Sequence, residues 1–178
     1  MASINNLLRP AYHSARSLAP GTRTFATTTH RRQTIPFEVT GKGKGVAQIV
    51  QVKNSHHEIK ADAYPAFGGQ DAAPSPLHYN LTSLSTCTQV TGSLVAKGLG
   101  IDLKGWNVSV DGRLDPGVLV EGVEGNANWR SIELRVEVVA DVEEGVFRKF
   151  ASETERRCPV TQLFKRSGVE WKSEWTKK

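Results

Sequence analysis

The chain contains very little cysteine: its 178 residues include only Cys87 and Cys158. Two thiols can form a single intramolecular disulfide, which excludes a small scaffold held together by several disulfides. Two isolated cysteines also lack the short paired spacing of zinc ligands, so we expect no metal site. No apolar run approaches the roughly 20 residues that a membrane-spanning helix needs, and we expect no membrane partner.

Acidic residues are absent from the beginning of the chain, where no Asp or Glu precedes Glu38. The same segment is rich in Ser, Thr and Ala and contains Arg9, Arg16, Arg23, Arg31 and Arg32. This composition is typical of an organellar transit peptide, and Arg23-Thr-Phe25-Ala26 resembles a mitochondrial processing site. We predict a mitochondrial transit peptide over residues 1–25, a flexible lead-in over 26–34 and a location in the matrix. The alternative is a disordered basic arm that binds acidic surfaces.

The net positive charge lies partly in this N-terminal segment. Removing residues 1–25 takes away three positive charges and no negative charge, so the formal charge falls from +5 to +2. No dense basic stripe remains, and we expect no nucleic-acid partner. A hydrophobic content of 38% is typical of one globular domain, which we predict over residues 35–178.

The first part of this domain is predicted to contain three short strands. The expected strands are residues 35–41, 46–53 and 56–61. Gly41–Gly45 is expected to form a hairpin turn between the first two, because glycine readily adopts positive φ. Residues 66–75 are rich in glycine, proline and small side chains, so a loop is expected there.

A long helix is predicted to follow this loop and to carry the first cysteine. Ser75 can cap the helix, Pro76 suits its first turn, and Gly98 is expected to end it. Cys87 follows Leu84 by three residues, which places it near the apolar face of the helix. The small Ser and Thr residues along this helix allow another element to pack closely, so we expect the helix to be central and largely buried.

The second part of the domain is predicted to mix strands and helices. The expected elements are strands at 106–114, 128–139 and 168–175, helices at 143–157 and 159–166, and pairing at a turn around 118–123. Within residues 128–139, apolar residues from Ile132 to Val138 alternate with charged ones, which indicates a strand with one wet face. This order predicts an α+β fold with helices against one face of an antiparallel sheet.

Cys158 stands in a setting that favours a negatively charged sulfur. Arg156 and Arg157 precede it, and Pro159 is expected to begin a helix whose N-terminus also stabilises a thiolate. The thiolate is the reactive form of cysteine. The residues alone leave two interpretations open. The cysteines are either a functional pair of thiols or small buried apolar side chains, as free cysteines often are.

Two motifs resemble those of the OsmC/Ohr family. The first is Ala73-Pro-Ser-Pro76 followed by a helix of small residues that reaches Ser85-Thr-Cys87. The second is Arg157-Cys158-Pro-Val160. The order of the predicted elements is also similar, so the resemblance covers about residues 35–176.

The resemblance implies an OsmC-like α+β fold, with antiparallel sheets on long central helices and two chains forming an intertwined homodimer. It implies a thiol peroxidase in which Cys87 attacks an organic hydroperoxide and becomes a sulfenic acid. Cys158 would then resolve this acid to a disulfide. A lipoyl or thioredoxin-type dithiol would reduce the disulfide, and no metal, haem or flavin cofactor would be needed.

The chain departs from the family at the residues that activate the peroxidatic cysteine. Family hydroperoxide reductases have a glutamate where this chain has Leu77, and the neighbouring His78 points about 100° away on a helix. Their N-terminal hairpin supplies an arginine, whereas this hairpin offers only Lys42 and Lys44. The alternative is therefore a non-enzymatic OsmC-like dimer that acts as a redox sensor or stress-associated binding protein.

Overall fold

The computed structural model describes residues 33–178, and its first three strands form an antiparallel sheet in the order β1-β2-β3. These strands are β1 (Val39–Lys44), β2 (Ala47–Val52) and β3 (Glu58–Ala61). The predicted turn at 41–45 is wrong, because β1 continues to Lys44 and the turn is Gly45-Val46. Gly45 has the positive φ of 63° that such a turn requires.

The long helix α1 (Pro76–Leu99) begins as predicted but ends later. Ser75 caps it by accepting a hydrogen bond from the His78 backbone N–H, and Pro76 occupies the first turn. Gly98 remains helical, and the residue that ends the helix is Gly100, with a left-handed φ of 70°. The helix therefore ends at the glycine that adopts the left-handed conformation, Gly100, and not at Gly98.

The second sheet has the order β4-β5-β6. Its strands are β4 (Leu103–Arg113), β5 (Ser131–Ala140) and β6 (Glu170–Lys177). Strands β4 and β5 pair antiparallel, whereas β5 and β6 pair parallel, so the expectation of antiparallel pairing is wrong for this last pair. The reason is that α2 (Glu144–Arg157) and α3 (Pro159–Arg166) lie between β5 and β6 in the chain. They form the crossover that parallel neighbours require.

Two short helical turns complete the described elements. Residues Pro65–Phe67 form a 3-10 turn in the loop before α1. Residues Gly117–Glu121 form a single π-helical turn, where we had expected strand pairing. Pro116 begins this turn and Gly122, with a φ of 68°, ends it. The apolar residues in the segment therefore belong to a turn and not to a strand.

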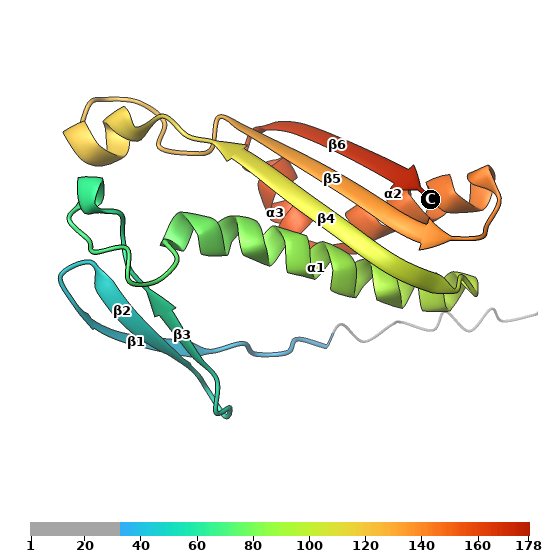
Figure 1. Ribbon diagram of the computed structural model, residues 1–178, viewed down its shortest axis with the longest axis horizontal. Helices are drawn as coiled ribbons and strands as arrows, with labels where there is room; N and C mark the ends of the chain where they lie inside the picture. The colour runs from blue at the N-terminus through green and yellow to red at the C-terminus, as the bar shows by residue number, and fades with distance from the viewer. Residues whose placement is uncertain (1–32) are drawn as a thin grey trace, which may run out of the picture. The chain divides into compact units, whose positions relative to one another are not determined.

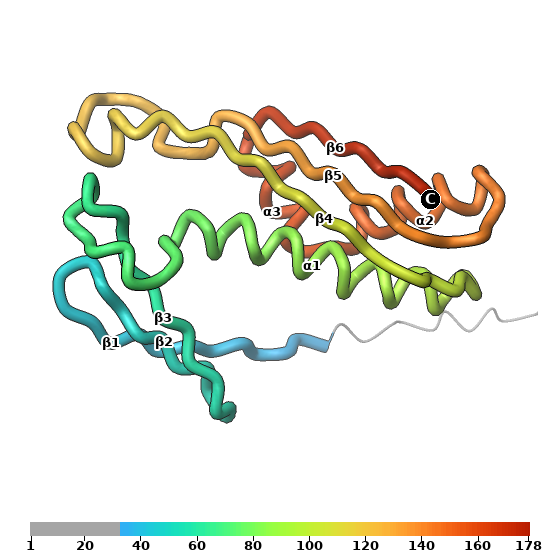
Figure 2. The backbone as a smooth tube through the Cα atoms, viewed as in Figure 1, coloured from blue at the N-terminus to red at the C-terminus, as the bar shows by residue number. Residues whose placement is uncertain are grey.

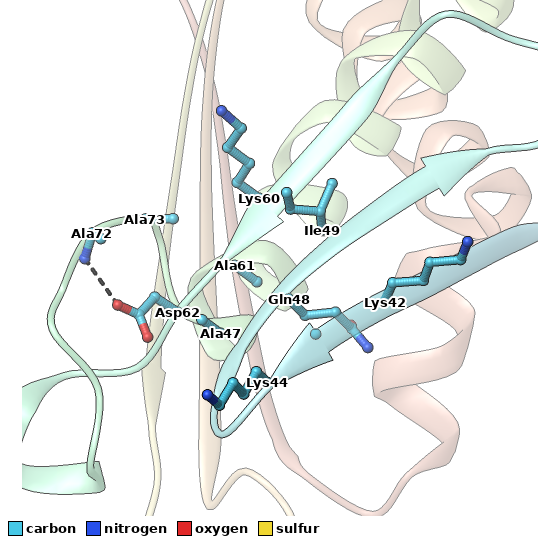
Figure 3. Close-up of a pocket in the computed structure, with 11 residues that line it drawn as sticks. Lys42, Lys44, Ala47, Gln48, Ile49, Lys60, Ala61, Asp62, Ala72 and Ala73 are labelled. Carbon is cyan, nitrogen blue, oxygen red and sulfur yellow. Dashed lines mark hydrogen bonds between the residues drawn. The ribbon is translucent and has the colours of Figure 1, made fainter.

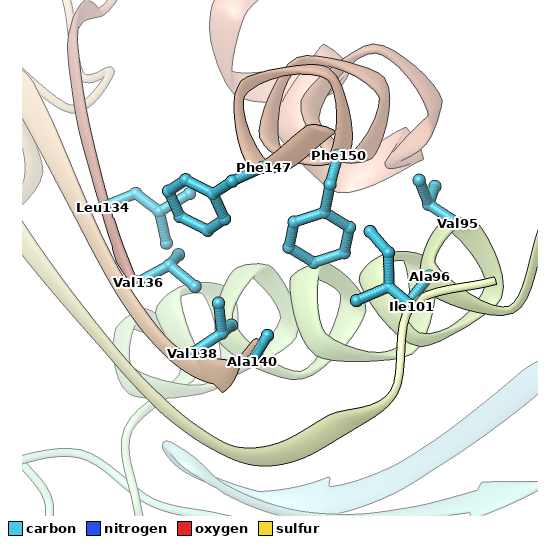
Figure 4. Packing of buried hydrophobic residues seen from close by; sticks show 9 residues of the cluster. All are labelled: Val95, Ala96, Ile101, Leu134, Val136, Val138, Ala140, Phe147 and Phe150. Atoms are coloured by element: carbon cyan, nitrogen blue, oxygen red, sulfur yellow. The ribbon is translucent and has the colours of Figure 1, made fainter. Parts of the chain in front are cut away.

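The three helices pack against one face of the β4–β6 sheet (Figure 1). The predicted alternation of β5 is confirmed, since its apolar side chains from Ile132 to Val138 are buried. Figure 4 shows Phe147 and Phe150 of α2 facing Leu134, Val136 and Val138. Gly92 allows α1 to approach closely, because a Cβ there would lie 2.3 Å from the Trp106 ring.

The β1–β3 sheet contributes little to this core. Within these three described strands no residue is buried, and Val39, Ile49 and Ile59 are exposed. Figure 2 traces the chain from β3 through the loop into α1. The Tyr79 hydroxyl of α1 donates a hydrogen bond to the Lys60 carbonyl of β3 at 2.6 Å, which ties the sheet to the beginning of the helix.

The predicted transit peptide over residues 1–25 lies outside the described residues, as does the lead-in over 26–34 except for its last two positions. These boundaries therefore stay predictions. Residues Phe37–Lys178 form one compact unit, which contains all the helices and strands described above. Among residues 33–178, no helix has the length and apolar character needed to cross a membrane.

Candidate active site

The two cysteines lie on different elements. Cys87 is in the middle of α1 and is partly exposed. Cys158 lies between α2 and α3 and is fully buried. Helices α1 and α3 pack against each other, and this packing brings the two free thiols close enough to influence each other's ionisation. We call this pair the two-thiol site.

Local backbone structure fixes the position of Cys158. Its N–H donates to the Thr154 carbonyl at 2.9 Å, which closes α2. Its own carbonyl accepts from Gln162 at 3.0 Å, and its Sγ accepts from the Thr161 N–H at 3.4 Å. Pro159 has no N–H and suits the first turn of α3. Cys158 therefore ends one helix and caps the next, as its position before a proline predicted.

The surroundings of Cys158 favour its negatively charged form. Burial by itself opposes ionisation, yet the pKa of Cys158 lies below its ordinary value. The hydroxyl and backbone N–H of Thr161, the thiol of Cys87 and the backbone N–H of Val160 all lower this pKa. These neutral donors converge at the N-terminus of α3, where the helix dipole also favours an anion.

Cys87 has the opposite tendency. Burial and the neighbouring Cys158 raise the pKa of Cys87 above its ordinary value. The Val160 N–H and the Thr91 hydroxyl lower it, but they do not compensate. Of the two thiols, Cys158 is therefore the more easily ionised.

The arginines before Cys158 are not the cause of its acidity. Arg156 pairs with Glu153 at 2.7 Å, and its side chain is 66% exposed. Neither Arg156 nor Arg157 is among the largest influences on the Cys158 pKa. The sequence analysis missed Thr161, although its position three residues after the capping residue is where a cap receives its backbone N–H.

The lysines of the N-terminal hairpin lie at a different place from the cysteines. Lys42 and Lys44 line a surface pocket of about 340 Å³, together with Lys60 and Asp62, and Figure 3 shows them around it. Neither cysteine lines this pocket. Among the described residues, neither Lys42 nor Lys44 forms an ion pair.

The beginning of α1 is also distant from Cys87. His78 contacts Ser75, with Oγ and Nδ1 3.1 Å apart, and its ring packs edge-on to Tyr64. Leu77 lines an apolar cavity of about 650 Å³ with Phe67. Ten residues of helix place position 77 about 15 Å from Cys87 along the axis. Leu77 and His78 therefore do not approach the cysteine of their own chain.

Solved structures with the same fold include several bacterial proteins. An OsmC-like protein from Mycoplasma pneumoniae superposes with a TM-score of 0.69 at 19% identity, over 82% of this chain and 99% of that one. An organic hydroperoxide resistance protein from Elizabethkingia anophelis has a TM-score of 0.65 at 17% identity, over 83% of this chain and 99% of that one. Another organic hydroperoxide resistance protein, from Legionella pneumophila, has a TM-score of 0.62 at 12% identity, over 83% of this chain and 100% of that one. At these identities the likeness concerns the fold.

A search of curated proteins found no match. The sequence itself nevertheless matches one family, described as OsmC-like protein, over residues 68–174. This range contains α1, the β4–β6 sheet apart from its last residues, and both cysteines. Together with the shared fold, this match over more than half of the sequence shows that the chain belongs to the OsmC-like protein family.

Proposed function

We propose that this protein is a thiol peroxidase that reduces organic hydroperoxides to alcohols. The observation that carries the proposal is the pairing of one partly exposed thiol with one buried thiol inside the same chain. An external peroxide can reach Cys87 from solvent. Cys158 is fully buried and has an internal partner within reach, which suits a resolving cysteine.

The proposed cycle balances with sulfur as the only redox centre. The Cys87 thiolate attacks the outer oxygen of the hydroperoxide, the O–O bond breaks, and the alkoxide leaves as the alcohol after taking up a proton. The resulting sulfenic acid then condenses with the Cys158 thiolate, which forms the disulfide and releases water after protonation. An external dithiol, lipoyl or thioredoxin-type, reduces the disulfide by exchange.

The family and its similar structures support this chemistry. Two of the structures described above are named organic hydroperoxide resistance proteins. The present chain shares their fold, and its two cysteines adjoin each other where α1 meets α3. The transfer of activity from those proteins to this chain is part of the proposal, because identities below 20% carry the fold and not the substrate.

A homodimer is the second part of the proposal. The β1–β3 sheet has no buried residue within one chain, and α1 exposes Val90 and Leu94 beside a groove of about 570 Å³. Surfaces of this kind are usually covered by a partner. A second copy would also be the source of any hairpin lysine, Lys42 or Lys44, or any residue such as His78 that approaches Cys87.

The test is an intact-mass measurement on the reduced protein after addition of one equivalent of an organic hydroperoxide. A peroxidase loses two hydrogen atoms rapidly, retains no free thiol and releases one equivalent of alcohol. The Cys87→Ser variant is expected to release none, whereas Cys158→Ser is expected to stop at a sulfenic acid that a dimedone probe traps. Equal alcohol release by Cys87→Ser and the parent would refute the proposal.

The non-enzymatic alternative is favoured by two observations, the raised pKa of Cys87 and the leucine at position 77. A redox sensor of this kind would form the same disulfide slowly and would show no turnover with a dithiol reductant. Steady-state consumption of hydroperoxide with dihydrolipoamide or thioredoxin as the reductant distinguishes the two functions.

The mitochondrial location is also proposed, on the basis of the arginine-rich and acid-poor N-terminal composition. A fluorescent protein fused after residue 34 is expected to enter the matrix. The same fusion lacking residues 1–25 is expected to stay outside. Equal distributions of the two fusions would argue against a transit peptide.

A further inference from the structure

The two sulfurs of the two-thiol site differ in how a second molecule can reach them. Cys87 is partly exposed, whereas Cys158 has an exposed fraction of 0%. We propose that the dithiol reductant attacks the disulfide at Cys87 and that Cys158 is the leaving sulfur. This inference rests on the proposed peroxidase function and assigns a direction to the half of the cycle that regenerates the thiols.

The backbone holds Cys158 in its buried position. Its N–H donates to the Thr154 carbonyl at 2.9 Å, and its carbonyl accepts from the Gln162 N–H at 3.0 Å. Pro159 follows directly and has a fixed φ in the first turn of α3. Both backbone groups of Cys158 therefore belong to helical hydrogen bonds. Bringing this sulfur to the surface would require the end of α2 or the beginning of α3 to unwind.

The geometry of disulfide exchange adds to this difference in exposure. A thiolate attacks in line with the S–S bond, from the side opposite the leaving sulfur. Attack on Cys158 would therefore have to come from the side where α2 and α3 join, because Cys87 lies on α1. Attack on Cys87 needs no such path, since the opening that admits the hydroperoxide to Cys87 also admits the reductant.

The surroundings of Cys158 also suit a leaving thiolate. Its Sγ accepts the Thr161 N–H at 3.4 Å at the N-terminus of α3. The Thr161 side chain is fully buried, and its Oγ1 has no hydrogen-bond partner among the described residues, so this hydroxyl can donate to a sulfur anion. A thiol with a lower pKa leaves faster. The pKa of Cys158 lies below its ordinary value although burial opposes ionisation, whereas burial raises the pKa of Cys87.

The electrons balance in two exchange steps. In the first step, one thiolate of the reductant forms a bond to the Cys87 sulfur, the bond between Cys87 and Cys158 breaks, and its electron pair leaves with Cys158. In the second step, the other thiolate of the reductant attacks the reductant sulfur of the mixed disulfide, and Cys87 leaves as a thiolate. The dithiol has then lost two electrons and become a disulfide. Its two protons pass to solvent or to the protein thiolates.

The experiment stops the exchange after the first step. The reduced full-length protein is oxidised with diamide, which forms the disulfide without hydroperoxide. It is then mixed with glutathione, a monothiol that has no second sulfur to complete the reduction. Samples are quenched with acid at early times, free thiols are blocked with N-ethylmaleimide, and the two cysteine peptides are analysed by mass. Glutathione is expected on Cys87 at least about tenfold more often than on Cys158.

Each outcome of this measurement decides a separate point. Equal labelling of the two cysteines, or glutathione mainly on Cys158, would refute the inference. If diamide forms no disulfide, the inference fails together with the resolving role of Cys158. If glutathione binds Cys87 as expected but the protein releases no alcohol from a hydroperoxide, the peroxidase function fails and the direction of attack stands.

A reaction in concentrated urea provides the control for the fold. Unfolding exposes both sulfurs, so the preference for Cys87 is expected to fall to less than about twofold. Arg156 and Arg157 stay next to Cys158 in the unfolded chain. A preference of the same size in urea would therefore assign it to the local sequence and overturn the argument from burial.

Thr161 is a positioning residue in this scheme, and two variants separate its hydroxyl from its shape. Thr161→Val removes the hydroxyl and is expected to lower the equilibrium constant for reduction of the disulfide by glutathione about tenfold. Thr161→Ser keeps the hydroxyl and is expected to match the parent. The same constant in all three proteins would contradict the role of the hydroxyl. Circular dichroism melting of both variants checks that a difference does not come from a folding defect.

Discussion

Oxidation of the two-thiol site gives a stability prediction that follows from its geometry. A disulfide between Cys87 and Cys158 closes a loop of about 70 residues, and loop-closure entropy at this length stabilises a folded protein by about 4 kcal/mol. The disulfide also weakens the hydrogen bond from the Thr161 N–H, because a disulfide sulfur is a poorer acceptor than a thiolate sulfur. A hydrogen bond to a charged group contributes about 1.5–3 kcal/mol. We therefore expect a net gain in unfolding free energy of about 1–3 kcal/mol.

The assay compares urea unfolding of the reduced protein and of protein oxidised with diamide, at one protein concentration, by tryptophan fluorescence. Diamide forms the disulfide without peroxidase chemistry, so the result depends on geometry and not on activity. Cys158→Ser, treated identically, is expected to show no gain. The oxidised parent should also have a smaller denaturant slope, because its unfolded state is more compact. An oxidised protein less stable than the reduced one would refute the adjacency of the two sulfurs.

Three further predictions concern packing, pH and assembly. Gly92→Ala should lower the unfolding free energy by about 1–3 kcal/mol in urea titration, because its Cβ would meet the Trp106 ring and this outweighs the higher helix propensity of alanine. Burial raises the pKa of Glu155, but hydrogen bonds from its neighbours lower it overall. Its stabilising contribution is therefore present above the unfolded pKa of about 4.3 and lost as pH falls through the lower folded pKa. Glu155→Gln should therefore reduce the fall in melting temperature at acidic pH, and the same dependence of melting temperature on pH in parent and variant would contradict this. Leu94→Glu should shift the protein towards monomer in light scattering, whereas Val146→Glu, at another exposed apolar position, should not.

The sequence predicts those elements whose ends depend on local chemistry. Helix α3 has its predicted bounds, Pro159–Arg166, because a capping residue and a proline define its beginning. The end of α1 is displaced from Gly98 to Gly100, since the sequence does not reveal which glycine adopts a left-handed conformation. The parallel pairing of β6 depends on the path of α2 and α3, which is a tertiary property.

The candidate site also has features that local sequence predicts and features that depend on tertiary packing. Each cysteine has a recognisable local context, and the resemblance to a family associates the two. The groups that influence the pKa of each cysteine could not be predicted from local sequence. Thr91, Val160 and Thr161 come together around the sulfurs only when α1 packs against α3. Sequence reasoning sought a cation for Cys87, whereas the groups that the described chain places there are neutral donors.

The presence of neutral donors in place of a cation has a physical rationale. A buried arginine beside a thiolate must be desolvated, and that cost is offset only if its remaining donors are satisfied. Backbone N–H groups at a helix N-terminus lack partners within the helix in any case, so their use by a sulfur anion adds little desolvation. In this chain, the Thr161 N–H at the N-terminus of α3 donates to Cys158 Sγ at 3.4 Å, and the pKa of Cys158 lies below its ordinary value. Helix-terminal N–H groups can therefore take the place of an arginine at Cys158, whereas Cys87 has the Val160 N–H and the Thr91 hydroxyl as its favourable neighbours. Hydroperoxide consumption by the parent, compared with that by Cys87→Ser, is therefore the measurement that separates a site that works without arginine from one that has lost its activity.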